Sequence, residues 1–354
     1  MENTVIKKKK PILKILLLVF AVFSVLCVIF GYRYYRFIFQ ANVKVENNEE
    51  YFYIPTGSNY EFVYQQLIDN GYVIDAKSFD WVAQQKNYPA KVKAGRYKIT
   101  SGMNNNELVN MLRAGNQSPV QVTFNNVRTI YQLAGKVGEK LETDSTKIIE
   151  LLTDKNFTQS IGFEPHTIIS MFIPNTYEFF WNTSAEKFIE RMKTEYDRFW
   201  NEERLQKADN VNLSPIEVSI LASVVQAEQS QHNEEKAIIS GLYLNRLQRG
   251  IALQSDPTLI FAKGDFSIQR VLNEDKLIDS PYNTYMYAGL PPGPINMPEM
   301  SSLEAVLNPE KHNYIFMCAK EDFSGFHNFA SSLSEHNRNA AKYQRALNER
   351  GIKR

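Results

Sequence analysis

The stretch Leu221-Ala-Ser-Val-Val-Gln-Ala-Glu228 places a carboxylic acid at the end of an apolar segment of helical character. Ser214 is a good N-cap, Pro215 suits the first helical position, and Glu217 completes a capping box. At about 100° per residue, Glu228 falls on the broad face of the apolar residues, whereas Gln226 points the other way. The residues of that face are Ile216, Ile220, Leu221, Val224 and Val225.

A glutamate in this position has a chemical consequence. Burial disfavours the charged form of a carboxyl group and raises its pKa, which is what a general acid needs near neutral pH. Two ordinary explanations stay open: the side chain bends out to water at the helix end, or it pairs with a basic residue such as Arg246. The pattern therefore makes Glu228 a candidate catalytic acid, with a structural role as the alternative.

The N-terminal region is typical of a retained membrane anchor. Residues 12–32 are almost wholly apolar and follow the basic run Lys7 to Lys10, which predicts one transmembrane helix with a cytoplasmic tail over residues 1–11. A cleaved signal peptide is the alternative, but Gly31-Tyr-Arg-Tyr-Tyr-Arg36 offers no small-residue cleavage site. The more polar residues 33–50 are predicted to be a linker.

The remaining sequence predicts an α+β fold with two parts, a small α/β module over residues 51–118 and a larger domain over residues 119–354. The near-neutral net charge of +1 gives no support for a nucleic-acid partner. In the small module we expect strands over 51–54 and 92–99 and helices over 60–70, 76–85 and 108–113. In the larger domain we expect strands over 120–124 and 314–319, and helices over 129–141, 148–152, 185–200 and from 334 onward, with one long or broken helix over 214–249.

Several blocks carry a family resemblance, and the Leu221–Glu228 stretch is one of them. The others, in chain order, are Lys93-Ala-Gly-Arg-Tyr-Lys-Ile-Thr-Ser-Gly-Met103 with Asn106-Glu-Leu-Val-Asn-Met-Leu-Arg-Ala-Gly115, Pro174-Asn-Thr-Tyr-Glu-Phe179, Leu244-Asn-Arg-Leu247, Leu253-Gln-Ser-Asp-Pro-Thr258, Tyr282-Asn-Thr-Tyr285, Gly289-Leu-Pro-Pro-Gly-Pro294, Gly325-Phe-His-Asn-Phe329 and Glu335-His-Asn337. With these blocks the chain resembles the membrane-anchored endolytic murein transglycosylases, the MltG or YceG-like family. It departs from the family pattern at Gln226, where the signature has a glutamate, and at Asn175, where it has an aspartate.

The resemblance implies a lyase of the bacterial inner (plasma) membrane, with an extracytoplasmic catalytic domain and a LysM-like module over residues 51–118. Such an enzyme cuts the MurNAc-GlcNAc bond within nascent glycan strands, forms 1,6-anhydromuramic ends and limits strand length. Glu228 would act first as acid and then as base. The implied partners are peptidoglycan strands and the synthases that make them, and no cofactor is implied.

Two other functions remain open. One is a non-catalytic, membrane-tethered peptidoglycan-binding scaffold, and the other is a hydrolytic muramidase that uses Asp256 as a second carboxylate. Asp256 also has a structural explanation, because Asp256-Pro257 fits an N-cap followed by proline at the first helical position.

Further candidates for substrate binding are polar or aromatic side chains in the family-like blocks. They are Asn245, Gln254, Asp256, Thr258, Tyr282, Asn283, Thr284, Tyr285, His327 and Asn337. The histidines show no metal-binding spacing, so no metal site is predicted and a zinc peptidase is disfavoured.

Overall fold

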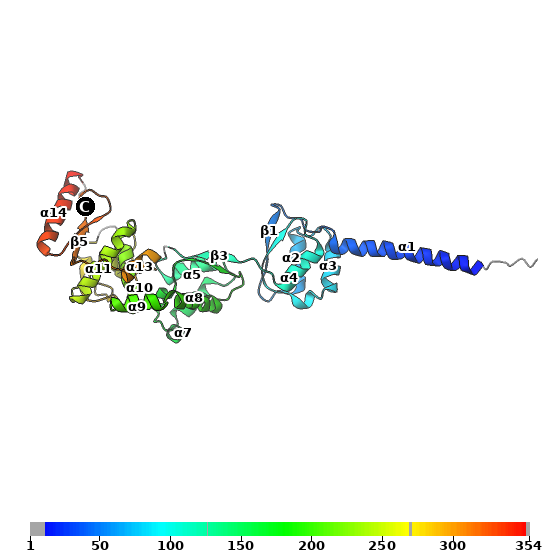
Figure 1. Cartoon of the computed structure of the whole chain (residues 1–354), viewed down its shortest axis with the longest axis horizontal. Helices are drawn as coiled ribbons and strands as arrows, with labels where there is room; N and C mark the ends of the chain where they lie inside the picture. The colour runs from blue at the N-terminus through cyan, green and yellow to red at the C-terminus, as the bar shows by residue number, and fades with distance from the viewer. Residues whose placement is uncertain (1–10, 126, 269–270, 352–354) are drawn as a thin grey trace, which may run out of the picture. The chain divides into compact units, whose positions relative to one another are not determined.

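The computed structural model describes residues 11–125, 127–268 and 271–351 of the chain. These residues form two compact units (Figure 1). Unit 1 comprises Met1–Val120 and Phe180–Asn182, and unit 2 comprises Gln121–Phe179 and Thr183–Arg354. Helices and short antiparallel strand pairs occur in both units, which confirms the α+β class.

Unit 1 has a two-stranded antiparallel sheet, in which Phe52 on the first strand lies opposite Tyr97 on the second. Both side chains are buried in a core shared with the helices. The helices begin at polar caps; Asn104, for example, forms a capping box with Glu107. The elements are α1 (Pro11–Phe39), β1 (Glu49–Ile54), α2 (Tyr60–Asp69), α3 (Ala76–Gln85), β2 (Gly95–Thr100) and α4 (Asn105–Ala114).

Helix α1 is a candidate membrane span by length and composition. Its segment Lys14–Phe39 has a window of mean hydropathy 2.8 with none of that window buried. This agrees with the predicted span over residues 12–32. Its large apolar side chains lie exposed along most of the helix, as expected of a surface that faces lipid.

The predicted linker over residues 33–50 is wrong. Helix α1 continues to Phe39, and the ring of Tyr34 stacks on Trp81 of α3 with centroids 5.0 Å apart. After the helix, Val43 and Val45 are buried in the core of unit 1. Hydropathy marks the end of an apolar run but not the end of a helix, and two valines separated by a lysine contribute little to a composition average.

Unit 2 begins with the paired strands β3 and β4, which pack on an aromatic cluster. Phe124, Phe172 and Phe188 lie within 6.4 Å of one another by ring centroid and are buried. This part contains β3 (Val120–Thr123), α5 (Ile130–Gly138), α6 (Ser145–Thr153), α7 (Lys155–Ser160), β4 (Thr176–Phe179), α8 (Ala185–Phe199) and α9 (Glu202–Asn210).

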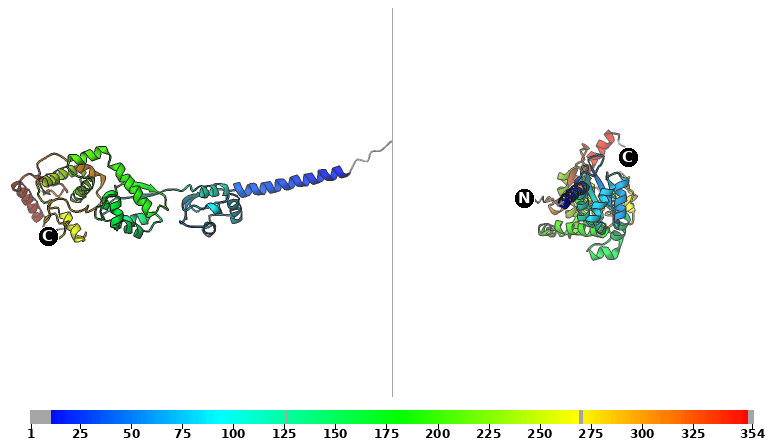
Figure 2. Two further views of the ribbon diagram at one scale, coloured as in Figure 1. Left: turned by 90° about the horizontal axis from the view of Figure 1, so that it is seen from below. Right: turned by 90° about the vertical axis from the view of Figure 1, so that its right-hand side faces the viewer.

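The rest of unit 2 is organised around α10, whose start is the predicted capping box of Ser214 and Glu217. Of the two possibilities expected over 214–249, one long helix or a broken one, the structure has the broken one, with α10 and α11 in contact with each other and with α13. The elements are α10 (Pro215–Glu228), α11 (Asn233–Gln248), α12 (Asp256–Lys263), α13 (Met300–Leu307), β5 (Phe316–Ala319), β6 (His327–Ala330) and α14 (Leu333–Glu349). Strands β5 and β6 form a hairpin against which α14 packs, and this C-terminal part can be followed in Figure 2.

One expectation about α10 needs correction. We expected a single broad apolar face, but every side chain from Val218 to Val225 is buried. A helix surrounded by neighbours is buried on all sides, and α10 contacts α9, α11, α12 and α13. Gln226 accepts hydrogen bonds from Lys236 and Ser302 across this packing, at 3.0 Å and 2.5 Å.

Candidate active site

Glu228 is the last residue of α10 and lines a cavity of about 360 Å³ in unit 2. The loop before α12 contributes Gln254, α12 contributes its first residue, Asp256, and the hairpin contributes β5 and His327. Segments far apart in the sequence therefore meet around one carboxyl group. Its side chain is half-buried, so the carboxyl group is enclosed by protein yet reachable from the cavity.

Two hydroxyl groups donate to the same oxygen of Glu228. The Tyr243 hydroxyl donates to Oε1 at 2.7 Å, and the Ser255 Oγ donates to Oε1 at 2.5 Å. No described residue donates a hydrogen bond to Oε2. When Glu228 is protonated, the proton therefore belongs on Oε2, the oxygen left free for a ligand in the cavity.

The protonation of Glu228 is controlled by opposing effects. Burial raises the pKa of the Glu228 carboxyl, the hydrogen bonds from Ser255 and Tyr243 lower it, and the nearby Asp256 raises it. The net direction is upward from the ordinary value, which favours the protonated form at a higher pH than for a glutamate in water. A raised pKa is the property that a general acid needs near neutral pH.

Arg246 does not pair with Glu228. Its guanidinium donates to the carbonyl oxygens of Ala252 and Ile315 and to Gln254 Oε1, all at 2.9 Å or less. The ion-pair explanation of Glu228 is therefore wrong, because Arg246 is occupied in fixing the loop that carries Gln254. That loop needs support, since Gln254 has a φ of 55°.

The capping explanation of Asp256 is also wrong. The N-cap position of α12 belongs to Ser255, so Asp256 is the first helical residue and Pro257 the second. The Asp256 carboxylate accepts a hydrogen bond from the Tyr285 hydroxyl at 2.5 Å, and both residues line the cavity. Asp256 is therefore a second carboxylate in the same cavity as Glu228.

His327 lines the cavity and is held by a buried carboxylate. Its backbone N–H donates to Glu235 Oε1 and its Nδ1 lies 2.9 Å from Glu235 Oε2. Because a carboxylate only accepts, Nδ1 carries the hydrogen and Nε2 remains for other partners. His336 of α14 also lines the cavity, whereas the predicted Asn337 is exposed and lies outside the lining.

Four of the predicted substrate-binding residues have structural partners instead. Asn245 donates to the carbonyls of His312 and Tyr314, Asn283 to those of Lys276 and Ile278, and the Tyr282 ring packs on Phe261 with centroids 4.7 Å apart. Thr258 donates to the carbonyl of Ser255. These side chains hold loops together and lie outside the cavity lining.

Thr284 has an indirect connection with the site. Its Oγ1 accepts a hydrogen bond from the Ser255 backbone N–H at 3.0 Å and bonds to Thr258 Oγ1 at 2.8 Å. It therefore fixes the residue that donates to Glu228. Among the predicted binding residues, the structure brings Gln254, Asp256, Tyr285 and His327 into the cavity.

Sequence reasoning missed three residues of this site. Tyr243 and Ser255 donate to Glu228, and Glu235 orients His327. Ser255 lies inside the family-like block Leu253–Thr258, but its neighbours Gln254 and Asp256 were chosen instead as the candidates for substrate binding. Nothing in the local pattern marks Tyr243 or Glu235, because both reach the site through the packing of α11 against α10.

Comparison with known proteins places this geometry in context. The model of the YceG-like family matches residues 52–342. An endolytic murein transglycosylase of Bacillus subtilis (strain 168) is 29% identical over 313 residues, covering 84% of this chain and 85% of the relative. One of Streptococcus pneumoniae serotype 2 is 27% identical over 359 residues, covering 92% of this chain but 64% of the relative.

A solved structure also resembles this chain. The crystal structure of a yceG-like protein from Listeria monocytogenes aligns with a TM-score of 0.55 and 27% identity, over 83% of this chain and 99% of that one. The family model covers most of the chain, including the segment from α10 to β6 that builds the cavity. On these grounds the chain belongs to the YceG-like family.

Proposed function

We propose that the protein is an endolytic peptidoglycan lytic transglycosylase whose acid and base is Glu228. The observation that carries the proposal is the environment of this carboxyl group: it faces a cavity, its pKa is raised by burial, and two hydroxyls bind one of its oxygens. The B. subtilis and S. pneumoniae relatives named endolytic murein transglycosylases support the substrate class.

The chemistry follows from the placement of the proton on Oε2. Glu228 donates this proton to the oxygen of the MurNAc-GlcNAc bond as the bond from C1 breaks. The C6 hydroxyl of the muramyl residue attacks its own C1, and Glu228, now a carboxylate, accepts the hydroxyl proton. No water is consumed, the product is a 1,6-anhydromuramic end, and the carboxyl group is regenerated. Tyr243 and Ser255 stabilise the carboxylate between the two proton transfers.

A hydrolytic muramidase that uses Asp256 is the second candidate. It is favoured by one observation: the carboxylate of Asp256 lies in the cavity with Glu228 and is oriented by Tyr285. A non-catalytic scaffold is less well supported, because a binding protein gains nothing from a desolvated carboxyl group whose charged form is disfavoured. Hydrolysis would give reducing muramic ends and a scaffold would leave the glycan intact, so both alternatives can be told apart from the lytic reaction.

We also propose that unit 1 is a LysM-like glycan-binding module behind a single span, with the cytoplasmic tail and extracytoplasmic units expected from the sequence. Tyr51 and Tyr53 on β1 are 39% and 43% exposed, and aromatic side chains of this kind suit contact with sugars, although the Arg96 guanidinium already lies over the Tyr51 ring at 3.5 Å. Anchoring at the membrane would direct the enzyme to nascent strands, limit their length and bring it near peptidoglycan synthases.

The test uses the full chain in detergent, because residues of α1 pack on unit 1. Uncrosslinked glycan polymer is incubated with the protein, and the new ends are identified by mass spectrometry. We expect anhydromuramic ends, lost in Glu228→Gln and retained in the matched surface variant Glu190→Gln. Reducing muramic ends would instead establish hydrolysis and implicate Asp256, and intact glycan would support the scaffold.

A further inference from the structure

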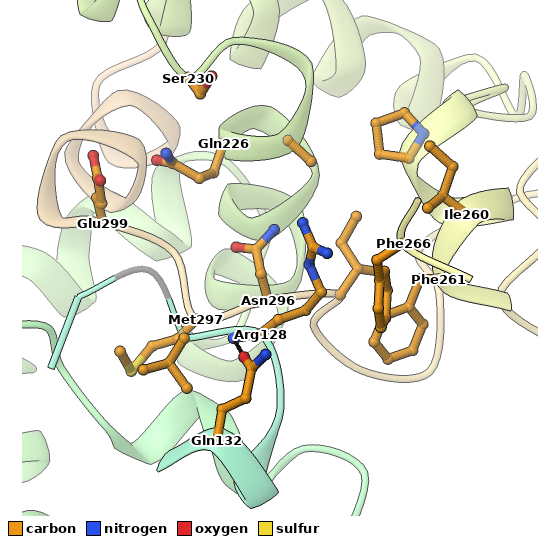
Figure 3. Close-up of a pocket in the computed structure, with 14 residues that line it drawn as sticks. Arg128, Gln132, Gln226, Ser230, Ile260, Phe261, Phe266, Asn296, Met297 and Glu299 are labelled. Carbon is orange, nitrogen blue, oxygen red and sulfur yellow. Dashed lines mark hydrogen bonds between the residues drawn. The ribbon is translucent and has the colours of Figure 1, made fainter. Parts of the chain in front are cut away.

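A second cavity, of about 520 Å³, lies beside the candidate active site and has no role in the mechanism above. Figure 3 shows that Arg128, Gln132 and Gln226 are among the side chains that line it. The N-terminal part of unit 2 contributes Arg128 and Gln132, whereas Gln226 comes from α10. The lining is mixed: it includes the aromatic rings of Phe261 and Phe266 together with these polar groups.

Residues adjacent in sequence line the two cavities. Ala227 lines the second cavity and its neighbour Glu228 lines the first; likewise Pro257 lines the second and Asp256 the first. Consecutive Cα atoms are about 3.8 Å apart. The end of α10 and the start of α12 therefore border both cavities, so a group attached to a sugar beside Glu228 would reach the second cavity past these residues.

Arg128 gives this cavity a free positive charge. Its guanidinium lies over the ring of Phe266, with the Cζ atom 4.3 Å from the centroid. Only its backbone N–H is engaged, by Gln132 Oε1 at 2.8 Å, and no ion pair occupies the guanidinium within the described parts of the chain. A guanidinium placed over a ring can bind a carboxylate through two parallel hydrogen bonds from its free N–H groups.

Gln226 adds a neutral donor where its family signature has a glutamate. Its Oε1 accepts from Lys236 and Ser302, so the Nε2 hydrogens are left for a ligand in the cavity. The cavity's own acidic residue, Glu299, lies 3.7 Å from Lys236 Nζ. An amide at position 226 therefore keeps a second carboxylate out of the cavity and leaves it suited to an anionic peptide.

We propose that the second cavity binds the stem peptide of the muramyl residue that occupies the active site. Arg128 binds a carboxylate of the peptide, and Gln226 Nε2 donates to one of its carbonyl oxygens. Stem peptides combine both groups, and they hang from the muramyl sugar on which Glu228 acts. This inference rests on the proposed function and refines its substrate: strands that carry stems are preferred over bare glycan.

The first test measures binding and does not depend on catalysis. The full chain in detergent is titrated by calorimetry with a synthetic muramyl peptide that has free carboxylates, and with its carboxamide analogue. We expect the free acid to bind about tenfold more tightly, and Arg128→Gln to abolish that preference. Gln226→Glu should also weaken binding of the free acid, while Arg249→Gln, an exposed arginine at the end of α11, should leave the preference unchanged.

Equal binding of the two ligands by the unmodified chain, or a preference that survives Arg128→Gln, would overturn the proposal.

The second test compares kcat/KM on stem-bearing strands and on strands stripped of stems by an amidase. The ratio of the two should fall about tenfold in Arg128→Gln, mainly through KM. An equal loss on both substrates would assign Arg128 a structural role and refute the inference.

The two tests also separate this inference from the proposed function. If no strand is cut but the muramyl peptide binds with its Arg128-dependent preference, the lytic function fails and the peptide site stands. If strands are cut with anhydromuramic ends but neither test depends on Arg128, the function stands and the peptide site fails.

Discussion

Replacing Tyr243 with phenylalanine should move the pH dependence of the reaction. The substitution removes one of the two hydroxyls that donate to Glu228 Oε1 and keeps the ring in place. The carboxylate form loses a donor, whereas the protonated form loses less. The pKa of Glu228, already raised by burial, should therefore rise further.

The size of the effect can be worked from the hydrogen bond. A hydrogen bond to a charged group contributes about 1.5–3 kcal/mol, and about 1.4 kcal/mol corresponds to a tenfold change in the acid dissociation constant. Ser255 remains as a donor and Glu228 is partly open to solvent, so the lower end applies. We expect the pKa of Glu228 to rise by about one in Tyr243→Phe.

The assay is the pH profile of kcat/KM for release of anhydromuramic ends. Glu228 must be protonated before the first step, so activity falls as pH rises through its pKa. In Tyr243→Phe this alkaline limb should move to higher pH. The control is Tyr177→Phe, which removes another buried hydroxyl in unit 2, one that donates to the Ile173 carbonyl. A limb that stays in place, or moves to lower pH, would refute the assigned role of Tyr243.

Three further outcomes are expected. Glu228→Gln should stabilise the fold increasingly as pH rises. Folding raises the pKa of Glu228, so its contribution to the free energy of unfolding is greatest below its unfolded pKa of about 4.3 and is lost as pH rises through its folded pKa. A difference in free energy of unfolding that does not change with pH would contradict this. Gln226→Glu should place an anion beside Lys236, a lysine whose pKa is lowered by burial, and should increase the free energy of unfolding at pH 7 by about 1 kcal/mol. Chemical denaturation that shows a lower free energy of unfolding would count against this. Gly241→Ala should cost about 1–3 kcal/mol, since a Cβ there would stand 2.3 Å from the Glu310 carbonyl oxygen, whereas Gly135→Ala, with nothing within 4 Å, should be neutral or stabilising by thermal unfolding.

Much of the fold was predictable where local signals are strong. Helix α3 begins and ends where the pattern predicted, because Asp75 caps it and its apolar spacing is regular. Helix α9 was missed: its sequence is highly polar, and Ala208 is its only buried residue, so it carries little periodic signal. Helices α12 and α13 are short, and tertiary contacts decide them more than propensity does.

The site shows the same division between local and tertiary information. Glu228 could be identified from sequence because its apolar surroundings are local to one helix. The amides and hydroxyls of Asn245, Asn283 and Thr284 were expected to bind sugars, yet buried loops need the same groups to satisfy their own backbone. Composition does not separate these two uses. Only the packed structure shows which oxygen of Glu228 is occupied.

The unbroken course of α1 into unit 1 changes how attachment to a membrane would work. A flexible tether would let unit 1 turn freely, whereas a helix whose end packs on α3 and α4 passes on its own rotation and tilt. One residue inserted into α1 would turn unit 1 by about 100° and displace it by about 1.5 Å along the helix axis. For a helix that spans the bilayer, the rotation of α1 about its axis therefore selects which face of unit 1 meets the headgroups, whereas the distance of unit 1 from the bilayer changes little.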